Sequence, residues 1–321
     1  MCPGVPPPGA RLHPRVSSPR PLCLIDASIY IYRAWHDWPA ATRDPAGRPA
    51  NAVAGFADTL LELLLRERPE GVVCAFDTCG REGVRNVLFP DYKRARPPTP
   101  PDLAAQIGRC MTLAPALGIA AFGSRRVEAD DIIGHFARLA HERGLPLTIV
   151  SGDKDLAQHV AEGDTYWDFG RQPKRDAKAL ERRLGVRPER IPDWLALCGD
   201  RSDGIPGVPG VGPATAARLI RKWGSLDVLY ANLDRVHRMR FRGAPGVAAR
   251  LTEHERTVRL ARRLTGSIGD SALPDTLSPL TRRPLTEEAY RAALLAAGLD
   301  ARRAERGAAA LAAIPAATDI A

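Results

Sequence analysis

Short apolar runs alternate with segments of helical periodicity through the first half of the chain. The apolar runs, which predict buried strands, are residues 22–25, 71–76, 119–122, 147–150 and 165–168. The segments with apolar residues at helical spacing are residues 52–66, 102–117 and 128–143. Strands and helices that alternate in this way predict an α/β domain, in which helices cover both faces of a parallel sheet.

The same patterns divide the 321 residues into four parts. Residues 1–21 are rich in proline and lack the apolar stretch of a signal peptide, so we expect a disordered arm. Residues 22–174 carry the α/β pattern, residues 175–300 are helical throughout and predict a second lobe, and residues 301–321 form an alanine-rich tail. Within the first domain, the connection at 78–101 is rich in Gly, Pro and basic residues. A connection of this length is either functional or a floppy insertion.

Acidic residues follow the ends of the expected strands and open the helical lobe. These acids are Asp26, Asp77, Glu128, Asp130, Asp131, Asp153, Asp155, Asp200 and Asp203. Because the carboxyl ends of parallel strands meet at one edge of a sheet, we expect the acids to converge there. A single acid after a strand or at a helix N-terminus has an ordinary structural explanation, whereas this many carboxylates repel one another unless cations are bound. The set predicts two divalent ions, Mg²⁺ or Mn²⁺, which at about 4 Å apart support phosphodiester hydrolysis.

The segment GIPGVPGVGPATAARLI at 204–220 contains two Gly/Pro turns before an expected helix that begins near Pro213. A glycine-rich turn that leads into a helix N-terminus presents backbone N–H groups to a phosphate. We therefore predict a helix–hairpin–helix at about 200–222 that holds duplex DNA, with a plain helix pair as the structural alternative. The residues expected to contact DNA are Gly207, Gly210, Gly212, Thr215, Arg218, Arg221 and Lys222.

The positive charge of the chain is concentrated in this second lobe. The net charge is +9 and the isoelectric point is about 9.6, values that fit either a nucleic-acid partner or a coding bias toward arginine. Residues 201–263 contain 13 Lys and Arg against five Asp and Glu, a balance of +8, so the rest of the chain carries only +1. The excess coincides with the hairpin, which favours a DNA-binding surface over a scattered bias.

The composition also bears on the expected compartment. No run approaches the roughly 18 consecutive apolar residues that a membrane span needs. The six cysteines include no CxxC pair, and two of them, Cys23 and Cys74, lie inside apolar runs. We therefore expect a reduced, cytoplasmic protein with no membrane partner.

Six motifs, taken in order, resemble one known family. The motifs are LIDAS, CAFD, VRNVLFPDYKRAR, EADD, SGDKDL and GDRSDGIPGVPGVG, and they span roughly residues 22–265. This combination resembles the bacterial 5′→3′ exonuclease and flap endonuclease family, which includes free-standing members and the N-terminal nuclease domain of DNA polymerase I. The resemblance implies a PIN-like nuclease domain and a helical lobe with a helix–three-turn–helix, the form of helix–hairpin–helix that clamps duplex DNA.

The resemblance divides the acids into two metal clusters. The residues that match the first cluster are Asp26, Asp77, Glu128 and Asp130. The residues that match the second cluster are Asp131, Asp153, Asp155 and Asp203, with Asp200 in support. Because the chain retains all of these carboxylates, the resemblance implies an active enzyme.

The resemblance also assigns roles to the connection at 78–101, which matches the arch of the family. Lys93 and Arg85 match arch residues that contact the scissile phosphate, and Arg33 matches a basic residue near the floor of the active site. The other arch residues expected to contact DNA are Tyr92, Arg94 and Arg96. Family members can hold a K⁺ ion between the hairpin and a DNA phosphate. The expected ligands of that ion are the carbonyl groups near Val208 and Val211.

The sequence thus predicts a metal-dependent nuclease that cuts 5′ flaps and trims 5′ ends of DNA by a two-metal mechanism, in primer removal and repair. The expected partners are DNA with 5′ flaps, ends or RNA primers, a DNA polymerase is a further candidate partner, and the expected state is a monomer. Two alternatives stay open at this point. One is a non-catalytic protein that binds branched DNA with the same clamp, and the other is a PIN-type ribonuclease, which the duplex-binding hairpin disfavours.

Overall fold

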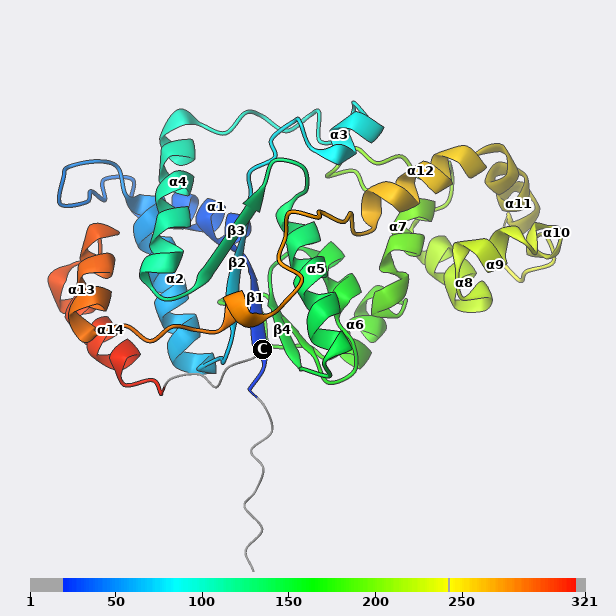
Figure 1. Ribbon diagram of the computed structural model, residues 1–321. Coiled ribbons are helices and arrows are strands. Elements are labelled where there is room, and N and C mark those ends of the chain that lie inside the picture. The colour runs from blue at the N-terminus through cyan, green and yellow to red at the C-terminus, as the bar shows by residue number, and fades with distance from the viewer. Residues whose placement is uncertain (1–19, 242, 316–321) are drawn as a thin grey trace, which may run out of the picture.

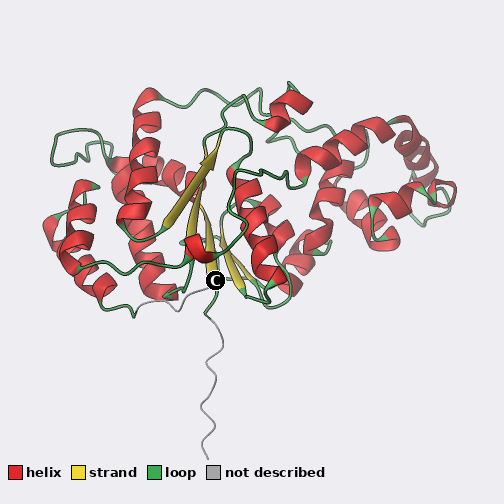
Figure 2. Cartoon of the chain, in the orientation of Figure 1, coloured by secondary structure: helices red, strands yellow, loops and turns green. Residues whose placement is uncertain are grey.

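Five parallel strands form one sheet at the centre of the protein (Figures 1 and 2). The structure, a computed structural model, describes residues 20–241 and 243–315. The strands are β1 (Leu22–Asp26), β2 (Val72–Asp77), β3 (Ala120–Ser124), β4 (Leu147–Val150) and β5 (Thr165–Trp167). Their order is β3-β2-β1-β4-β5, and all neighbours are parallel. The predicted α/β class is confirmed. The connections reverse direction between β1 and β4, and the crevice at the carboxyl ends of the strands at such a switch point is where an open parallel sheet binds its ligand.

Helices cover both faces of the sheet. The helices of this domain are α1 (Ala27–Asp37), α2 (Asn51–Glu67), α3 (Val84–Leu88), α4 (Pro101–Ala116) and α5 (Ala129–Glu142). Cys23 and Ile25 of β1 pack in the core that contains α2 and α4, whereas Leu22 and Leu24 pack in the core that contains α5. Successive side chains of a strand point to opposite faces, so a sheet covered on both sides requires an uninterrupted apolar run such as LCLI.

Residues 177–265 form a helical lobe that extends away from the sheet (Figure 1). Its helices are α6 (Ala177–Leu184), α7 (Ile191–Cys198), α8 (Pro213–Trp223), α9 (Leu226–Tyr230), α10 (Leu233–Val236), α11 (Ala244–Glu253) and α12 (Glu255–Thr265). The short 3₁₀ helices of the described chain are η1 (Lys154–His159), η2 (Pro188–Arg190) and η3 (Ser278–Leu280). Helix α7 packs against α8 and α12 within the lobe and against η1 next to the sheet. It therefore connects the lobe to the sheet domain.

The chain returns from the lobe to the sheet domain at its C-terminal side. Helices α13 (Glu287–Ala296) and α14 (Ala301–Ala312) pack on each other and against α4 and α2 (Figure 1). Tyr290 and Leu294 are buried in the same core as α2. The lobe expected at 175–300 therefore ends earlier, because the apolar face of α13 is covered by the sheet domain. The described part of the expected tail is mostly a packed helix. Residues 1–19 of the arm expected at 1–21, and residues 316–321 of the tail, lie outside the described residues.

The segment that leads from η3 to α13, here called the returning segment, forms hydrogen bonds at the edge of the sheet where the strands begin. Arg282 N–H donates to Glu70 O (2.9 Å) and Arg283 N–H donates to Gly118 O (3.2 Å). Gly118 has φ +73°, and a Cβ there would lie 2.1 Å from Arg283 O. This close approach requires glycine at position 118.

Replacing Gly118 by Ala is expected to lower the free energy of unfolding by about 2–3 kcal/mol, because it adds backbone strain and a clash. Urea unfolding measures the change. Gly108→Ala is the matched control, since Gly108 lies in α4 with open space around its Cα, and Ala there is expected to stabilise by about 0.5–1 kcal/mol. Equal effects of the two substitutions would contradict this account of the returning segment.

Candidate active site and nucleic-acid interface

The acids predicted from the strand ends meet at the carboxyl edge of the sheet. Asp26 ends β1 and Asp77 ends β2, and Asp77 Oδ1 accepts a hydrogen bond from the N–H of Ala129 at the start of α5 (2.7 Å). Ser151, which follows β4, donates from Oγ to Asp26 Oδ2 (2.9 Å) and accepts from Asp153 N–H (3.0 Å). Hydrogen bonds therefore tie the acids of three strand ends and one helix to the same edge.

Burial and mutual repulsion raise the pKa values of acids in this group. Burial raises the pKa of Asp26 to about 7, and the neighbouring charges of Asp77 and Asp153 add to the shift. Burial also raises the pKa of Asp130 well above its ordinary value, again with Asp153 and Asp26 as neighbours. A bound cation would relieve this repulsion, so the group is electrostatically suited to attract one.

A second group of acids lies beside the first. Burial raises the pKa of Asp155 to about 7, and Asp153 contributes to the shift. Asp155 Oδ1 is buried, accepts no hydrogen bond, and faces Lys154 Nζ at 3.3 Å. Asp200, in contrast, accepts from Lys154 Nζ (2.7 Å) and from the N–H and Oγ of Ser202 (2.8 and 2.5 Å). Asp155 Oδ1 is thus held only by the ion pair with Lys154, whereas hydrogen bonds from the chain hold Asp200.

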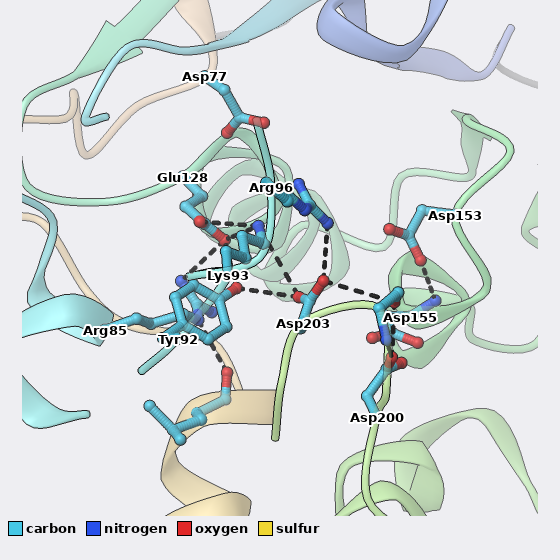
Figure 3. Close-up of polar contacts among 12 residues, drawn as sticks. Asp77, Arg85, Tyr92, Lys93, Arg96, Glu128, Asp153, Asp155, Asp200 and Asp203 are labelled. Carbon is cyan, nitrogen blue, oxygen red and sulfur yellow. Dashed lines mark hydrogen bonds and ion pairs between the residues drawn. The ribbon is translucent and has the colours of Figure 1, made fainter. Parts of the chain in front are cut away.

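Cations of the arch reach between the two groups (Figure 3). Lys93 Nζ lies 2.8 Å from both oxygens of Glu128 and 3.8 Å from Asp203 Oδ2, and Arg96 Nη2 lies 2.7 Å from Asp203 Oδ1. The backbone of Lys93 has φ +53°, a conformation that costs energy for a residue with a Cβ, and its N–H donates to Asp203 O (2.8 Å). Strain of this kind persists where the surroundings hold a residue in place, and here they aim the ammonium group at the acids.

The other predicted arch residues, Tyr92 and Arg94, differ in their exposure to solvent. Tyr92 was expected to contact DNA, but its ring is 3% exposed and its hydroxyl lies 2.9 Å from Glu128 Oε2 and 3.0 Å from Asp203 Oδ2. Arg94 is exposed and pairs with Asp91. Tyr92 therefore links the two acidic groups, and of these two residues only Arg94 is exposed.

Arg85 and Asp131 pair with each other. The guanidinium Nη1 lies 2.5 Å from Asp131 Oδ2, Nη2 lies 2.9 Å from Oδ1, and both side chains are buried. Arg85 was expected to contact the scissile phosphate and Asp131 a metal ion. In this structure the two side chains bind each other, and both roles stay predictions.

The oxygen donors of the site fit a hard divalent ion. Among the described residues, no three carboxylate, imidazole or thiol groups enclose a metal position as they stand, and Lys93, Arg96 and Lys154 hold oxygens of the acids. The donor chemistry nonetheless suits Mg²⁺ or Mn²⁺, because the set consists of carboxylates that repel one another.

The predicted hairpin joins α7 to α8. Val208 N–H donates to Leu197 O (2.8 Å), and the backbone of Gly207 approaches α7 so closely that a Cβ would lie 2.3 Å from the carbonyl carbon of Cys198. Gly212 is the N-cap of α8 and has open space around its Cα. After Gly212, one face of α8 carries Thr215, Arg218 and Lys222 at helical spacing. Arg218, Arg221 and Lys222 are exposed. The hairpin thus presents a helix N-terminus and basic side chains together.

Two family models match the chain, and together they span residues 21–288. The first, described as the 5′-3′ exonuclease N-terminal resolvase-like domain, matches residues 21–185, and the second, described as the 5′-3′ exonuclease C-terminal SAM fold, matches residues 186–288. The chain belongs to the 5′-3′ exonuclease family. The resemblance of its motifs to that family is confirmed.

Relatives of this 5′-3′ exonuclease family member match it over most or over a small part of their own length. The 5′-3′ exonuclease of Aquifex aeolicus is 34% identical over 217 residues, which cover 68% of this chain and 74% of the relative. The DNA polymerase I of Pseudomonas aeruginosa is 40% identical over 248 residues, which cover 77% of this chain and 27% of the polymerase. The match therefore spans about a quarter of the length of that polymerase.

Solved structures share the fold of the family member. The T5 D15 protein crystallised with metal ions has a TM-score of 0.62 at 18% identity, with 77% of this chain and 89% of that chain covered. The catalytic core of Rad2 in complex with a DNA substrate has a TM-score of 0.59 at 13% identity, with 91% of each chain covered. At these identities the likeness shows the fold.

The structure of this exonuclease family chain adds Asp168, Ser151 and Arg250 to the residues that the sequence singled out. Asp168, directly after β5, forms an ion pair with Arg33, which was predicted near the floor of the site (Nη1 to Oδ1, 2.6 Å). Ser151 stands in the motif SGDKDL directly after β4, and that position was the available signal for it. The guanidinium of Arg250 in α11 lies next to Gly210 of the hairpin, and its buried Nε has no hydrogen-bond partner among the described residues. No sequence signal marked this residue.

Proposed function

We propose that this chain is a divalent-metal-dependent nuclease that hydrolyses DNA phosphodiester bonds at 5′ flaps and 5′ ends. The observation that carries the proposal is the convergence of mutually repelling carboxylates and arch cations at one edge of the sheet, next to a basic hairpin lobe. Membership of the 5′-3′ exonuclease family and the name of the Aquifex relative support it. The T5 structures with bound metal ions support the use of metal.

Two groups of acids would hold the ions. The residues proposed for the first ion are Asp26, Asp77, Glu128 and Asp130. The residues proposed for the second ion are Asp153, Asp155 and Asp203, with Asp200 positioning Lys154. Two bound Mg²⁺ or Mn²⁺ ions supply activation of the attacking water and stabilisation of the leaving oxygen.

The cations of the arch would bind the phosphate that is cut. Lys93 and Arg96 already lie at the edge of the acidic groups, so a phosphate drawn to that edge would meet an ammonium and a guanidinium group. Their positive charge stabilises the charge that develops on the phosphate oxygens. Arg33 would remain at the floor of the site through its ion pair with Asp168.

The hairpin lobe would hold the duplex without reading its sequence. Backbone N–H groups around Gly212, at the start of α8, and the basic residues of that helix suit the phosphate backbone. A K⁺ ion at the carbonyl groups of Val208 and Val211 is part of this proposal. The proposal further includes action in primer removal and repair, a DNA polymerase as partner, a monomeric state and a cytoplasmic location. Among the described residues, no helix has the length and apolar character of a membrane span.

A labelled 5′-flap substrate tests the proposal. Product mapping during titration with Mg²⁺ and Mn²⁺ is expected to show cleavage near the flap junction, with a blunt duplex and an RNA flap as comparison substrates. No product at any concentration of either ion would identify a non-catalytic DNA-binding protein. Faster cleavage of the RNA flap would identify a ribonuclease.

The contribution of the hairpin lobe can be measured by charge removal. Arg218→Ala with Lys222→Ala is expected to weaken duplex binding in Ca²⁺ by about tenfold at 0.1 M salt and to reduce the slope of log K against log salt by about 2. The matched control is Arg302→Ala with Arg306→Ala, which removes the same charge from exposed positions of α14. Equal weakening by both pairs would assign binding to net charge and not to the hairpin.

A further inference from the structure

A bidentate ion pair between Arg85 and Asp131 is buried where the arch meets the rest of the protein. Arg85 is 6% exposed and Asp131 is 1% exposed. Arg85 lies in α3 of the arch, and Asp131 lies in the first turn of α5. Two parallel N–H···O contacts of this kind fix the relative orientation of both side chains.

Each partner also holds the end of the helical lobe. Arg85 Nε donates to Leu264 O (2.8 Å) and Nη2 donates to Gly266 O (3.0 Å), which are at the end of α12. Asp131 Oδ1 accepts from the N–H of Ile268 in the segment that follows (2.8 Å). The pair therefore joins three parts of the chain that lie far apart in sequence, namely the arch, the sheet domain and the helical lobe.

Asp131 also fixes the turn that carries the acids of the first group. Its Oδ2 accepts from Glu128 N–H (3.0 Å), and this contact belongs to a capping box at the start of α5. Each oxygen of Asp131 consequently has two donors, one from Arg85 and one from the backbone. A carboxylate with its acceptor sites occupied in this way is poorly placed to bind a metal ion, and the same holds for Arg85 and a phosphate.

The structure assigns to Arg85 and Asp131 a positioning role, in which the pair locks the arch and the helical lobe to the turn that carries Glu128 and Asp130. This assignment rests on the proposed nuclease function, and it replaces metal binding by Asp131 and phosphate binding by Arg85. Lys93 and Arg96 lie in the same arch, so the pair sets where their charges stand relative to the acids.

Three variants test the assignment. Arg85→Met and Asp131→Asn each remove one partner, and the double variant Arg85→Met with Asp131→Leu replaces the ion pair by apolar side chains that can pack without a buried charge. The double variant keeps the test available if a single substitution prevents folding. The measurements are the single-turnover cleavage rate at saturating protein, at a temperature where all variants are folded, and Mn²⁺ binding without DNA by calorimetry. Asp130→Asn serves as the reference for a lost metal ligand.

A positioning pair predicts one common effect in all three variants. The single-turnover rate is expected to fall by about tenfold or more in each, with no further loss in the double variant. Mn²⁺ affinity is expected to fall far less than it does in Asp130→Asn, because the pair orients the metal ligands without binding the ion, and hydrogen exchange is expected to become faster in residues 84–96. The last two measurements need no cleavage, so they decide the assignment even if the unaltered protein cuts no DNA, an outcome that would refute the proposed function alone.

Other outcomes overturn the assignment. Loss of Mn²⁺ affinity in Asp131→Asn comparable to that in Asp130→Asn would make Asp131 a metal ligand. A rate in the double variant that falls by the product of the two single effects would show independent roles. Unchanged rates with lower melting temperatures would reduce the pair to a purely structural contact.

Discussion

Asp130→Asn is expected to lower the cleavage rate by about a thousandfold or more while DNA binding in Ca²⁺ stays within about threefold. Asp130 lies in the first turn of α5, and the charges of Asp153 and Asp26 raise its pKa together with burial. Its carboxylate thus lies near Asp26 at the end of β1 and Asp153 before η1. The amide of asparagine supplies no negative charge to bind a cation. The phosphate contacts of the hairpin lobe lie elsewhere, so binding is expected to persist.

The same substitution is expected to stabilise the protein when no metal is present. In EDTA at pH 8, removal of one repelling charge should raise the free energy of unfolding by about 1 kcal/mol or more. The sign follows from the raised pKa values, since the folded chain keeps protons on Asp26 and Asp155 up to about pH 7 while the ordinary pKa is 3.8. The metal-free protein therefore loses stability as pH rises from about 4 to about 7.

Cleavage assays in Mg²⁺ and thermal melts in EDTA check both parts of this prediction. Asp275→Asn is the matched control, because Asp275 is exposed and outside the site, and it should leave both quantities unchanged. Near-normal cleavage by Asp130→Asn would refute the proposed metal site.

Lys93→Met is expected to lower the single-turnover cleavage rate by about a hundredfold or more. The same variant is expected to bind Mn²⁺ more tightly than the unaltered protein when DNA is absent. The ammonium group of Lys93 lies 2.8 Å from both oxygens of Glu128, so it competes with a metal ion for that carboxylate. The apolar side chain of methionine removes the competitor and also removes the charge that would act on the phosphate.

Calorimetric titration with Mn²⁺ and rapid-quench cleavage of a flap substrate measure the two effects. Lys178→Met is the matched control, since Lys178 is an exposed residue of α6. Weaker Mn²⁺ binding by Lys93→Met would mean that the lysine supports the metal site, and normal cleavage would remove Lys93 from the proposed chemistry.

Local patterns in the sequence were sufficient for the sheet and for the position of the acids. The strands were recognisable because a sheet covered on both faces requires uninterrupted apolar runs, as in β1 and β4. The acids follow from topology, since parallel strands end at one edge. Helix α1 was not predicted, although Asp26 caps it, because Ile29, Tyr30 and Ile31 are residue types that favour strands.

Long-range pairings could not be predicted in the same way. The motif VRNVLFPDYKRAR identified Arg85 and Tyr92 as polar and aromatic groups of an arch, but their burial depends on α12 and on Asp203, more than 100 residues away. The contacts of Asp131 likewise depend on Ile268. An amphipathic pattern also cannot tell which surface covers a helix, and for this reason α13 was expected in the lobe.

Arg282 and Arg20 hold the two ends of the described chain at the side of the sheet that faces away from the acids. The buried guanidinium of Arg282 donates to Pro315 O (2.8 Å), while its backbone N–H donates to Glu70 O. Arg20, just before β1, donates to Arg68 O near the same edge. The described chain thus begins at residue 20 and ends at residue 315, each about 17 Å, the length of a five-residue strand, from the edge where DNA is proposed to bind. Immobilisation of the protein through a residue introduced at position 20 or 315 should therefore leave the nucleic-acid face open.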